Sequence, residues 1–254
     1  MLRLDQHRPG KNIKTQHDTA GGDHIVNIRQ LLAVVTAAAA FGTAASANAA
    51  LVTDCPVTAI VCYEYDNAQA AVALTGLPTR VGDDMQFTPA SFLALSNGAG
   101  FVTAGPANFV FSRVWTPGGQ EIASLTVNEE FDYEIVNGGD VRATLYMQAR
   151  SNLVSSDSLS NLWSLPIAGD SGGPQIANLS GTLLTAANFV QAANDMRVTI
   201  QDTLRANAGA GQLAWIQKKF TLVTETVVPV PAAVWLLGSG LGLLGMARRR
   251  QLIG

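Results

Sequence analysis

Residues 131–149 of this 254-residue chain have the sequence FDYEIVNGGDVRATLYMQA, and they decide the fold class. Apolar and polar side chains alternate in Phe131–Val136 and again in Val141–Ala149, the period of a β-strand with one buried face. Between them lies Asn137-Gly138-Gly139-Asp140, whose residue types tolerate positive φ. The pattern predicts two antiparallel strands joined by a hairpin turn.

The same two-residue period recurs along most of residues 50–226. It appears in Asn108–Trp115, in Glu121–Val127, and on both sides of the glycine-rich residues 208–211, in Met196–Ala206 and Leu213–Glu225. Residues 151–161 are polar and typical of a loop, while residues 185–195 form the one segment with helical spacing. Several strands separated by turn signals predict a mostly β protein, an antiparallel β-sandwich of jelly-roll-like type.

The C-terminal residues 227–254 have a different character. Val227–Ala247 is a run of 21 residues without a charge, and about 20 are needed to cross a bilayer as a helix. We therefore expect one transmembrane helix, with the following Arg248, Arg249 and Arg250 as a cytoplasmic stop because arginine is costly at bilayer depth. Just before it, Pro229 and Pro231 favour a stiff, extended segment.

This three-part order resembles the C-terminal sorting signal of PEP-CTERM proteins, in its VPLPA-type variant. The matching residues are Val228, Pro229, Val230, Pro231 and Ala232, followed by the apolar helix and the terminal arginines. Val230 stands where that variant usually has leucine. The resemblance implies processing by an exosortase, a membrane cysteine transpeptidase, and delivery to the cell surface or the extracellular matrix. The alternative is a plain C-terminal membrane anchor.

The N-terminal residues 1–49 are predicted to be a targeting segment. A short cationic start at Asn27–Arg29 precedes the apolar run Leu31–Phe41, and Ala47-Asn48-Ala49 forms a signal peptidase site before Ala50. These are the parts of a secretory signal peptide. The polar residues ahead of them fit a misplaced start, with Val26 as the initiator. The exported domain is then residues 50–226, and residues 227–254 are the sorting signal.

The net charge argues against some classes of partner, and the cysteine content agrees with export. Residues 50–226 hold 16 Asp and Glu against 8 Lys and Arg, a net charge of −8 that the whole-chain value of −3 conceals. Such a domain is poorly suited to nucleic acid or anionic lipid. The two cysteines, Cys55 and Cys62, predict a disulfide near the mature N-terminus, because exported chains meet an oxidising environment.

One motif points to catalysis. Residues 169–174 are GDSGGP, similar to the sequence around the nucleophile of chymotrypsin-like serine proteases. That serine needs a histidine base, but His7, His17 and His24 all precede the predicted signal cleavage site. We therefore interpret Gly169–Pro174 as a tight turn in which Asp170 or Ser171 caps the backbone. A degenerate protease relative remains the remote alternative.

Other candidate side chains have ordinary structural explanations. The acidic group Glu129, Glu130, Asp132 and Glu134 is expected to be a set of solvated strand-edge charges, although oxygen-rich loops also bind Ca²⁺. The aromatic residues Trp115, Trp163, Trp215, Tyr63 and Tyr65 are expected in the core, with a sugar-stacking platform as the alternative. We predict no catalytic residue, no cofactor and no metal site.

The sequence therefore predicts a non-enzymatic exported protein of the cell surface or biofilm matrix. Its expected partners are signal peptidase, an exosortase, the inner membrane before processing, and extracellular polysaccharide. A carbohydrate-binding or carbohydrate-cleaving module with the same targeting is the alternative.

Overall fold

The computed structural model of the protein describes residues 50–191 and 193–228. The predicted signal peptide with Ala47 and Ala49, residues 229–232 of the sorting motif, the transmembrane helix and Arg248–Arg250 lie outside the described residues. Ala50 and Val228 lie within them. In the described part no helix is long and apolar enough to cross a membrane. Its one α-helix, α2, spans only Val72–Thr75.

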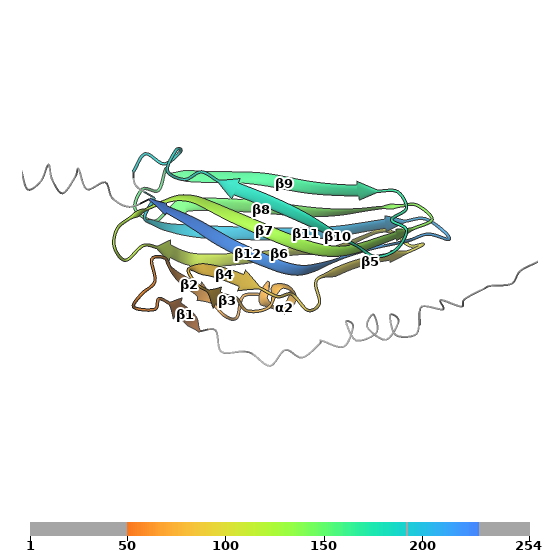
Figure 1. The fold of residues 1–254 in the computed structure, drawn as a ribbon, viewed down its shortest axis with the longest axis horizontal. Helices are drawn as coiled ribbons and strands as arrows, with labels where there is room; N and C mark the ends of the chain where they lie inside the picture. The colour runs from red at the N-terminus through yellow and green to blue at the C-terminus, as the bar shows by residue number, and fades with distance from the viewer. Residues whose placement is uncertain (1–49, 192, 229–254) are drawn as a thin grey trace, which may run out of the picture. The chain divides into compact units, whose positions relative to one another are not determined.

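Twelve strands form two antiparallel sheets (Figure 1). Sheet A contains, in spatial order, β1 (Leu51–Asp54), β2 (Cys62–Asp66), β6 (Gly100–Trp115), β11 (Asp195–Ala208), β8 (Asp140–Ser151) and β9 (Ser158–Ala168). Sheet B contains β10 (Gln175–Leu183), β7 (Glu121–Val136), β12 (Leu213–Val228), β4 (Asp84–Phe87) and β3 (Thr79–Val81), with β5 (Leu93–Asn97) also paired to β12. The predicted antiparallel β-sandwich is confirmed.

The chain runs through the sandwich like one long hairpin that has been rolled up. Strands β8 and β9 form its tip and pair directly. Moving outward from the tip, β7 pairs with β10, β6 with β11, and β4 with β12, all antiparallel. Apart from the β8–β9 hairpin, each step from β5 to β12 crosses between the sheets.

The hairpin predicted at residues 131–149 is wrong, although the turn itself is confirmed. Asn137, Gly138 and Gly139 all have positive φ, but β7 belongs to sheet B and β8 to sheet A. The segment therefore crosses from one sheet to the other. The pairing partners of the two strands explain why. Strand β7 pairs along its whole length with β12 of sheet B, while β8 pairs with β11 of sheet A. A backbone turn fixes the reversal of the chain, but long-range pairing decides which sheet the returning strand joins.

A second crossing turn, between β11 and β12, packs against the first. The Gln212 side-chain amide donates to the Asn137 backbone carbonyl at 2.9 Å, and the Asn137 side-chain amide donates to the Gly211 carbonyl at 3.2 Å. A Cβ on Gly139 would lie 2.5 Å from the Asn207 carbonyl oxygen. Only glycine therefore fits at this contact between the two turns.

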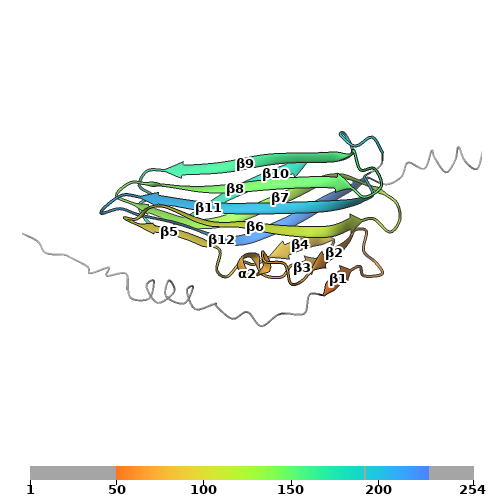
Figure 2. The ribbon, with the colours of Figure 1, turned by 180° about the vertical axis from the view of Figure 1, so that it is seen from behind.

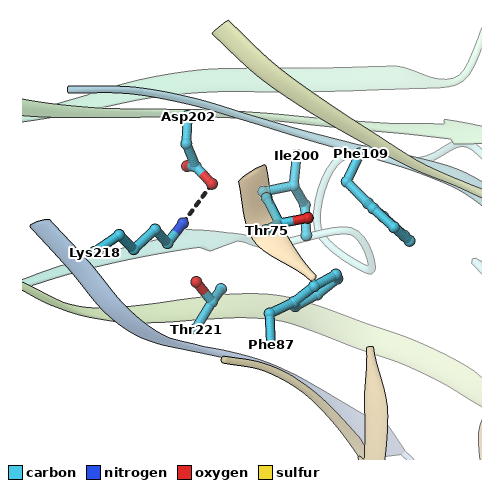
Figure 3. Close-up of a pocket in the computed structure, with 7 residues that line it drawn as sticks. All are labelled: Thr75, Phe87, Phe109, Ile200, Asp202, Lys218 and Thr221. Atoms are coloured by element: carbon cyan, nitrogen blue, oxygen red, sulfur yellow. Dashed lines mark hydrogen bonds and ion pairs between the residues drawn. The ribbon is translucent and has the colours of Figure 1, made fainter. Parts of the chain in front are cut away.

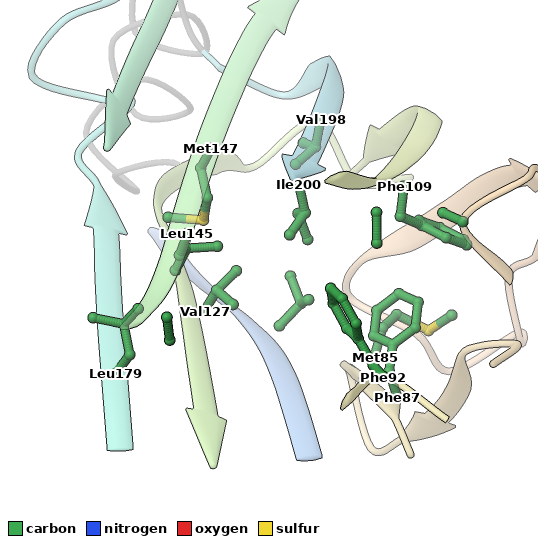
Figure 4. Close-up of a cluster of buried hydrophobic side chains, with 14 of the residues drawn as sticks. Met85, Phe87, Phe92, Phe109, Val127, Leu145, Met147, Leu179, Val198 and Ile200 are labelled. Carbon is green, nitrogen blue, oxygen red and sulfur yellow. The ribbon is translucent and has the colours of Figure 1, made fainter. Parts of the chain in front are cut away.

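The core lies between the sheets and is built from the inward residues of each alternating strand (Figure 4). At one end, Tyr63, Tyr65, Phe87, Phe109 and Phe111 form an aromatic cluster with tilted or edge-on ring contacts. Such geometries are favourable for aromatic pairs. In both ribbon views β1–β4 and α2 gather along one flank of the long strands, and β9 lies along the other (Figure 2).

Two local predictions are wrong. Residues 185–195 are not helical: the described residues form turns and bends up to the start of β11 at Asp195. The Thr185 hydroxyl donates to the Ile122 carbonyl and fixes the segment across β7 instead. The predicted loop 151–161 is shorter, because Ser158–Asn161 already belong to β9, an edge strand whose side chains are mostly exposed.

The boundary expected at residue 226 also lies inside a strand. Strand β12 continues to Val228, where Val227 and Val228 pair with Ile122 and Glu121. At the other end of the domain, Cys55 and Cys62 form the predicted disulfide, with their Cα atoms 4.6 Å apart. It ties the loop after β1 to the first residue of β2.

Candidate functional site: a buried lysine–carboxylate cluster

An ion cluster lies in the middle of the sandwich. The Lys218 ammonium group donates to the Glu129 Oε1 and to the Asp202 Oδ2. The exposed fractions of the three side chains are 1%, 1% and 5%. Lys218 and Glu129 come from sheet B and Asp202 from sheet A, so the cluster bridges the two layers.

Strand periodicity points all three side chains inward. On β12 Lys218 follows the buried Ala214 and Ile216, and on β11 Asp202 lies between the buried Ile200 and Leu204. On β7 Glu129 occupies the inward position between Val127 and Phe131. Each charged residue thus takes a place where the pattern of its strand calls for an apolar one.

The backbone is irregular at both ends of the cross-sheet contact. The register between β12 and β7 shifts between Lys218 and Phe220, and that between β11 and β6 shifts between Asp202 and Leu204. Opposite Asp202, a Cβ on Gly105 would lie 2.7 Å from the Asp202 carbonyl oxygen. The Lys218 amide donates to the Phe92 carbonyl at 2.9 Å, just before β5 begins. These features are bulges that aim individual side chains.

Burial and charge together set the protonation of the cluster. Burial raises the pKa of Glu129 well above its usual range, and the neighbouring Asp202 adds to the rise, while Lys218 opposes it. Burial by itself lowers the pKa of Lys218, but the two carboxyl groups outweigh it and the pKa is raised. A cluster of one ammonium, one carboxylate and one carboxylic acid has no net charge. This state has the lowest free-energy cost of burial inside a protein.

A small cavity adjoins the contact between Asp202 and Lys218 (Figure 3). These two residues and Thr221 line one part of it, and Phe87, Phe109 and Ile200 line another. The space open to the centre of a water molecule is about 10 Å³, the lower limit for one water. Among the described residues, the Asp202 Oδ1 and the Thr221 hydroxyl have no hydrogen-bond partner.

The acidic group predicted to be solvated is therefore split. Glu129 is buried, so its prediction as a strand-edge charge is wrong: β7 lies between β10 and β12 and is not an edge strand. The other members point outward. Asp132 pairs with Lys219 at 3.1 Å, and Glu134 accepts a hydrogen bond from the Trp215 indole at 3.1 Å. The described residues contain no group of three or more potential metal ligands.

A second buried carboxyl group lies near the end of β12. Burial raises the pKa of Glu225 to about 8. Its Oε2 lies in hydrogen-bond contact with the Tyr63 hydroxyl, which also donates to the Asp83 carbonyl at 2.6 Å. A hydroxyl has one hydrogen, so a protonated Glu225 supplies the second one and satisfies both contacts.

The GDSGGP segment is a turn, as expected. It joins β9 to β10, with Gly169, Gly172 and Gly173 at positive φ. The Ser171 hydroxyl accepts from the Ile135 amide at 3.0 Å and lies 2.7 Å from the Gly173 carbonyl, to which it donates. The Asp170 carboxylate accepts from the Gly172 amide at 3.2 Å. Ser171 thus fastens the turn to β7.

The aromatic residues are distributed between the core and the surface. Tyr63 and Tyr65 are buried, as expected. Trp163 covers Gly181, where a Cβ would lie 2.6 Å from the ring, and so closes the side of the sandwich between β9 and β10. The Trp115 ring is covered by the Arg113 guanidinium at 4.5 Å, which occupies one of its faces. Among the described residues these aromatics do not form one platform.

Sequence comparison finds no family model and no curated protein that matches the chain. Structural comparison finds distant likenesses. The D431N mutant VP2 protein of infectious bursal disease virus has 13% identity and a TM-score of 0.28, covering 65% of this chain and 41% of that one. The arabinose-bound MgGH51 α-L-arabinofuranosidase has 19% identity and a TM-score of 0.19, covering 69% and 22%. A CBM4 structure has 9% identity and a TM-score of 0.19, covering 71% and 95%.

The chain thus spans about two fifths of the VP2 chain it matches.

Glu225→Gln is expected to make stability less dependent on pH. With a pKa of 4.5 when exposed and about 8 when folded, Glu225 loses its proton in the unfolded chain first. The free energy of unfolding therefore falls as pH rises from about 4.5 to 8, by up to about 1.4 kcal/mol for each pH unit. Urea unfolding across this range should show a shallower decline in the variant. Glu130→Gln, on the outer face of β7, is the control; an equal effect there would contradict the assignment.

Ser171 is expected to be unreactive. A fluorophosphonate probe should leave the folded protein unlabelled, because the turn holds the hydroxyl and residues 50–228 contain no histidine that could act as its base. Ser171→Ala should lower the free energy of unfolding by about 1 kcal/mol through loss of the bond to the Ile135 amide. Labelling that disappears in Ser171→Ala would revive the hydrolase hypothesis.

Proposed function

We propose that the protein is a non-enzymatic, exported component of the cell surface or the extracellular matrix. One observation carries the non-enzymatic part: the side chains with potential chemistry are already engaged by other groups of the fold. The Lys218 cluster lies between the sheets, and Ser171 is engaged by backbone groups. A substrate would therefore have to displace these internal contacts before it could react with either group.

The targeting part of the proposal rests on the terminal sequences. The Cys55–Cys62 disulfide supports export, since such bonds persist in oxidising compartments. Cleavage at the two proposed sites would also leave the sandwich intact. Strand β1 begins at Leu51, directly after the proposed signal peptidase site, and the described part of β12 extends to Val228, where the proposed sorting motif begins.

We infer that the sandwich is a jelly roll. The support is the rolled-up hairpin, in which β6, β11, β8 and β9 face β4, β12, β7 and β10. This is eight strands in two sheets, with pairing nested around the β8–β9 tip. The turns that cross between the sheets at each end are then the loops in which such a scaffold tolerates variation.

Carbohydrate binding is the second candidate function, and one surface feature favours it. A shallow hollow of about 280 Å³ lies on the outer face of sheet B, over β7, β10 and β12. It is lined by Asn128, Glu130, Asn178, Ser180 and Phe220, among others. Amides, hydroxyls, a carboxylate and an aromatic ring are the groups that orient sugar hydroxyls and pack against sugar rings.

The leading proposal predicts a doubly processed protein in the producing cells. Mass spectrometry of membrane, surface and medium fractions should find a form that begins at Ala50 and ends within residues 228–232, outside the inner membrane. An intact C-terminus through Gly254, confined to membranes, would show an ordinary anchor instead. A chain retained with residues 1–49 would contradict the proposed export.

The carbohydrate proposal predicts binding without hydrolysis. On a panel of matrix polysaccharides, Phe220→Ala and Asn178→Ala should each weaken binding about tenfold, which corresponds to about 1.4 kcal/mol. Val190→Ala, an exposed apolar residue elsewhere, is the matched control. Equal binding by all variants would remove the hollow from consideration, and release of sugar products would contradict the non-enzymatic assignment.

A further inference from the structure

We propose that Lys218 and Asp202 become joined by an intramolecular amide bond, between the lysine Nζ and the aspartate Cγ, with Glu129 as the catalytic acid and base. The bond would form within the folded chain and link β12 of sheet B to β11 of sheet A. The inference does not depend on where the protein is delivered.

The first support is the contact between the reacting groups. The Lys218 Nζ lies against the Asp202 carboxyl group before any reaction, and both backbones are fixed by strand pairing on either side. Holding a nucleophile against an electrophile in this way replaces a bimolecular encounter and removes a large part of the activation barrier. Because a lysine and a carboxylate in water do not condense, the fold must also lower the remaining part of the barrier.

The second support is the dry surroundings. The three side chains are almost fully buried, and the Phe92 ring lies 6.0 Å from the Nζ. Phe87, Phe109 and Ile200 line the adjoining cavity. The carboxyl groups hold the pKa of Lys218 raised, but burial alone acts in the opposite direction. Transfer of the ammonium proton to a carboxylate within the cluster removes two buried charges and yields the neutral amine that attacks. The apolar surroundings also exclude the bulk water that would favour hydrolysis.

The third support is Glu129, which contacts the attacking nitrogen. Burial raises the pKa of Glu129 well above its usual range, which favours the protonated form of its carboxyl group. A general acid and base within hydrogen-bond reach of the reacting atoms is what the step requires. Glu129 can give its proton to an oxygen of Asp202 and recover one from the nitrogen of Lys218.

The atoms and charges of the step balance without a co-reactant. The Lys218 ammonium first passes a proton to Asp202, leaving an amine and a carboxylic acid. The nitrogen attacks Cγ while Glu129 protonates the carboxyl oxygen and then removes a proton from the nitrogen. The C–O bond breaks, and one water leaves with the oxygen and two of the protons. Lysine and aspartate end as a neutral amide, and Glu129 again carries its proton.

The cavity favours Asp202 over Glu129 as the acceptor of the new bond. Asp202 and Lys218 both line it, as Figure 3 shows, whereas Glu129 does not. Its volume suits the one water that leaves. The Asp202 Oδ1 has no hydrogen-bond partner among the described residues, so this carboxyl group is not fully satisfied as an ion. Conversion to an amide removes a buried charge pair, whose desolvation is costly.

The test is the mass of the intact chain. The full-length protein should be expressed, folded, and then denatured with its disulfide reduced. We expect it to be lighter than its sequence by one water. Trypsin should release a branched peptide that joins residues 198–205 to residues 206–219, because the amide blocks cleavage after Lys218. An unbranched digest with the full sequence mass overturns the proposal, and so does a bond to the Glu129 peptide, residues 114–142.

Three variants assign the roles. Lys218→Met removes the nucleophile and Glu129→Gln removes the proton carrier, so each should have its full sequence mass. Lys219→Arg changes the exposed neighbour and keeps the tryptic site, so it should still lack one water. Dehydration that persists in Lys218→Met would belong to another residue and overturn the proposal. If a variant fails to fold, the wild-type digest still decides, because it needs no comparison.

Discussion

The interior of this sandwich is organised around one ammonium group. A lysine enclosed between two sheets is strongly unfavourable unless anionic groups surround it, and here they come from β7 in the same layer and β11 in the opposite one. That requirement fixes the relative position of three strands and both sheets. Lys218 also lies at the point where β12 exchanges β5 for β4 as its neighbour.

Much of the fold follows from alternation in the sequence, but its topology does not. The two-residue period correctly identifies parts of β6, β7, β8, β11 and β12, and it correctly gives an antiparallel sandwich. The turn at Asn137–Gly139 is also evident, because only certain residues accept its positive φ. Its path from one sheet to the other is not evident. Strand β7 pairs with β12, which begins 77 residues after β7 ends. Local residues specify a reversal of direction, while partners remote in sequence specify the layer.

The buried cluster could have been found from the same alternation. Lys218 continues the inward series of Ala214 and Ile216, and Asp202 interrupts the series Met196, Val198, Ile200, Leu204 and Ala206. Residue type predicts the opposite, because charged residues are rarely buried. Glu129 is also close in sequence to three acidic residues that are not buried. The periodicity was the better guide here. That the three charges meet is beyond the sequence, because the contact depends on the packing of one sheet on the other.

The central place of β12 has a mechanical consequence. The strand pairs with β7 along one edge and with β5 and β4 along the other, and it ends at Val228. A pull applied at Val228 along the strand would load these backbone hydrogen bonds together, in shear, rather than one after another. An edge strand such as β9 has neighbours on one side only and would separate under a smaller force. A domain tethered through β12 would therefore transmit tension through a strand that is held by neighbours on both sides.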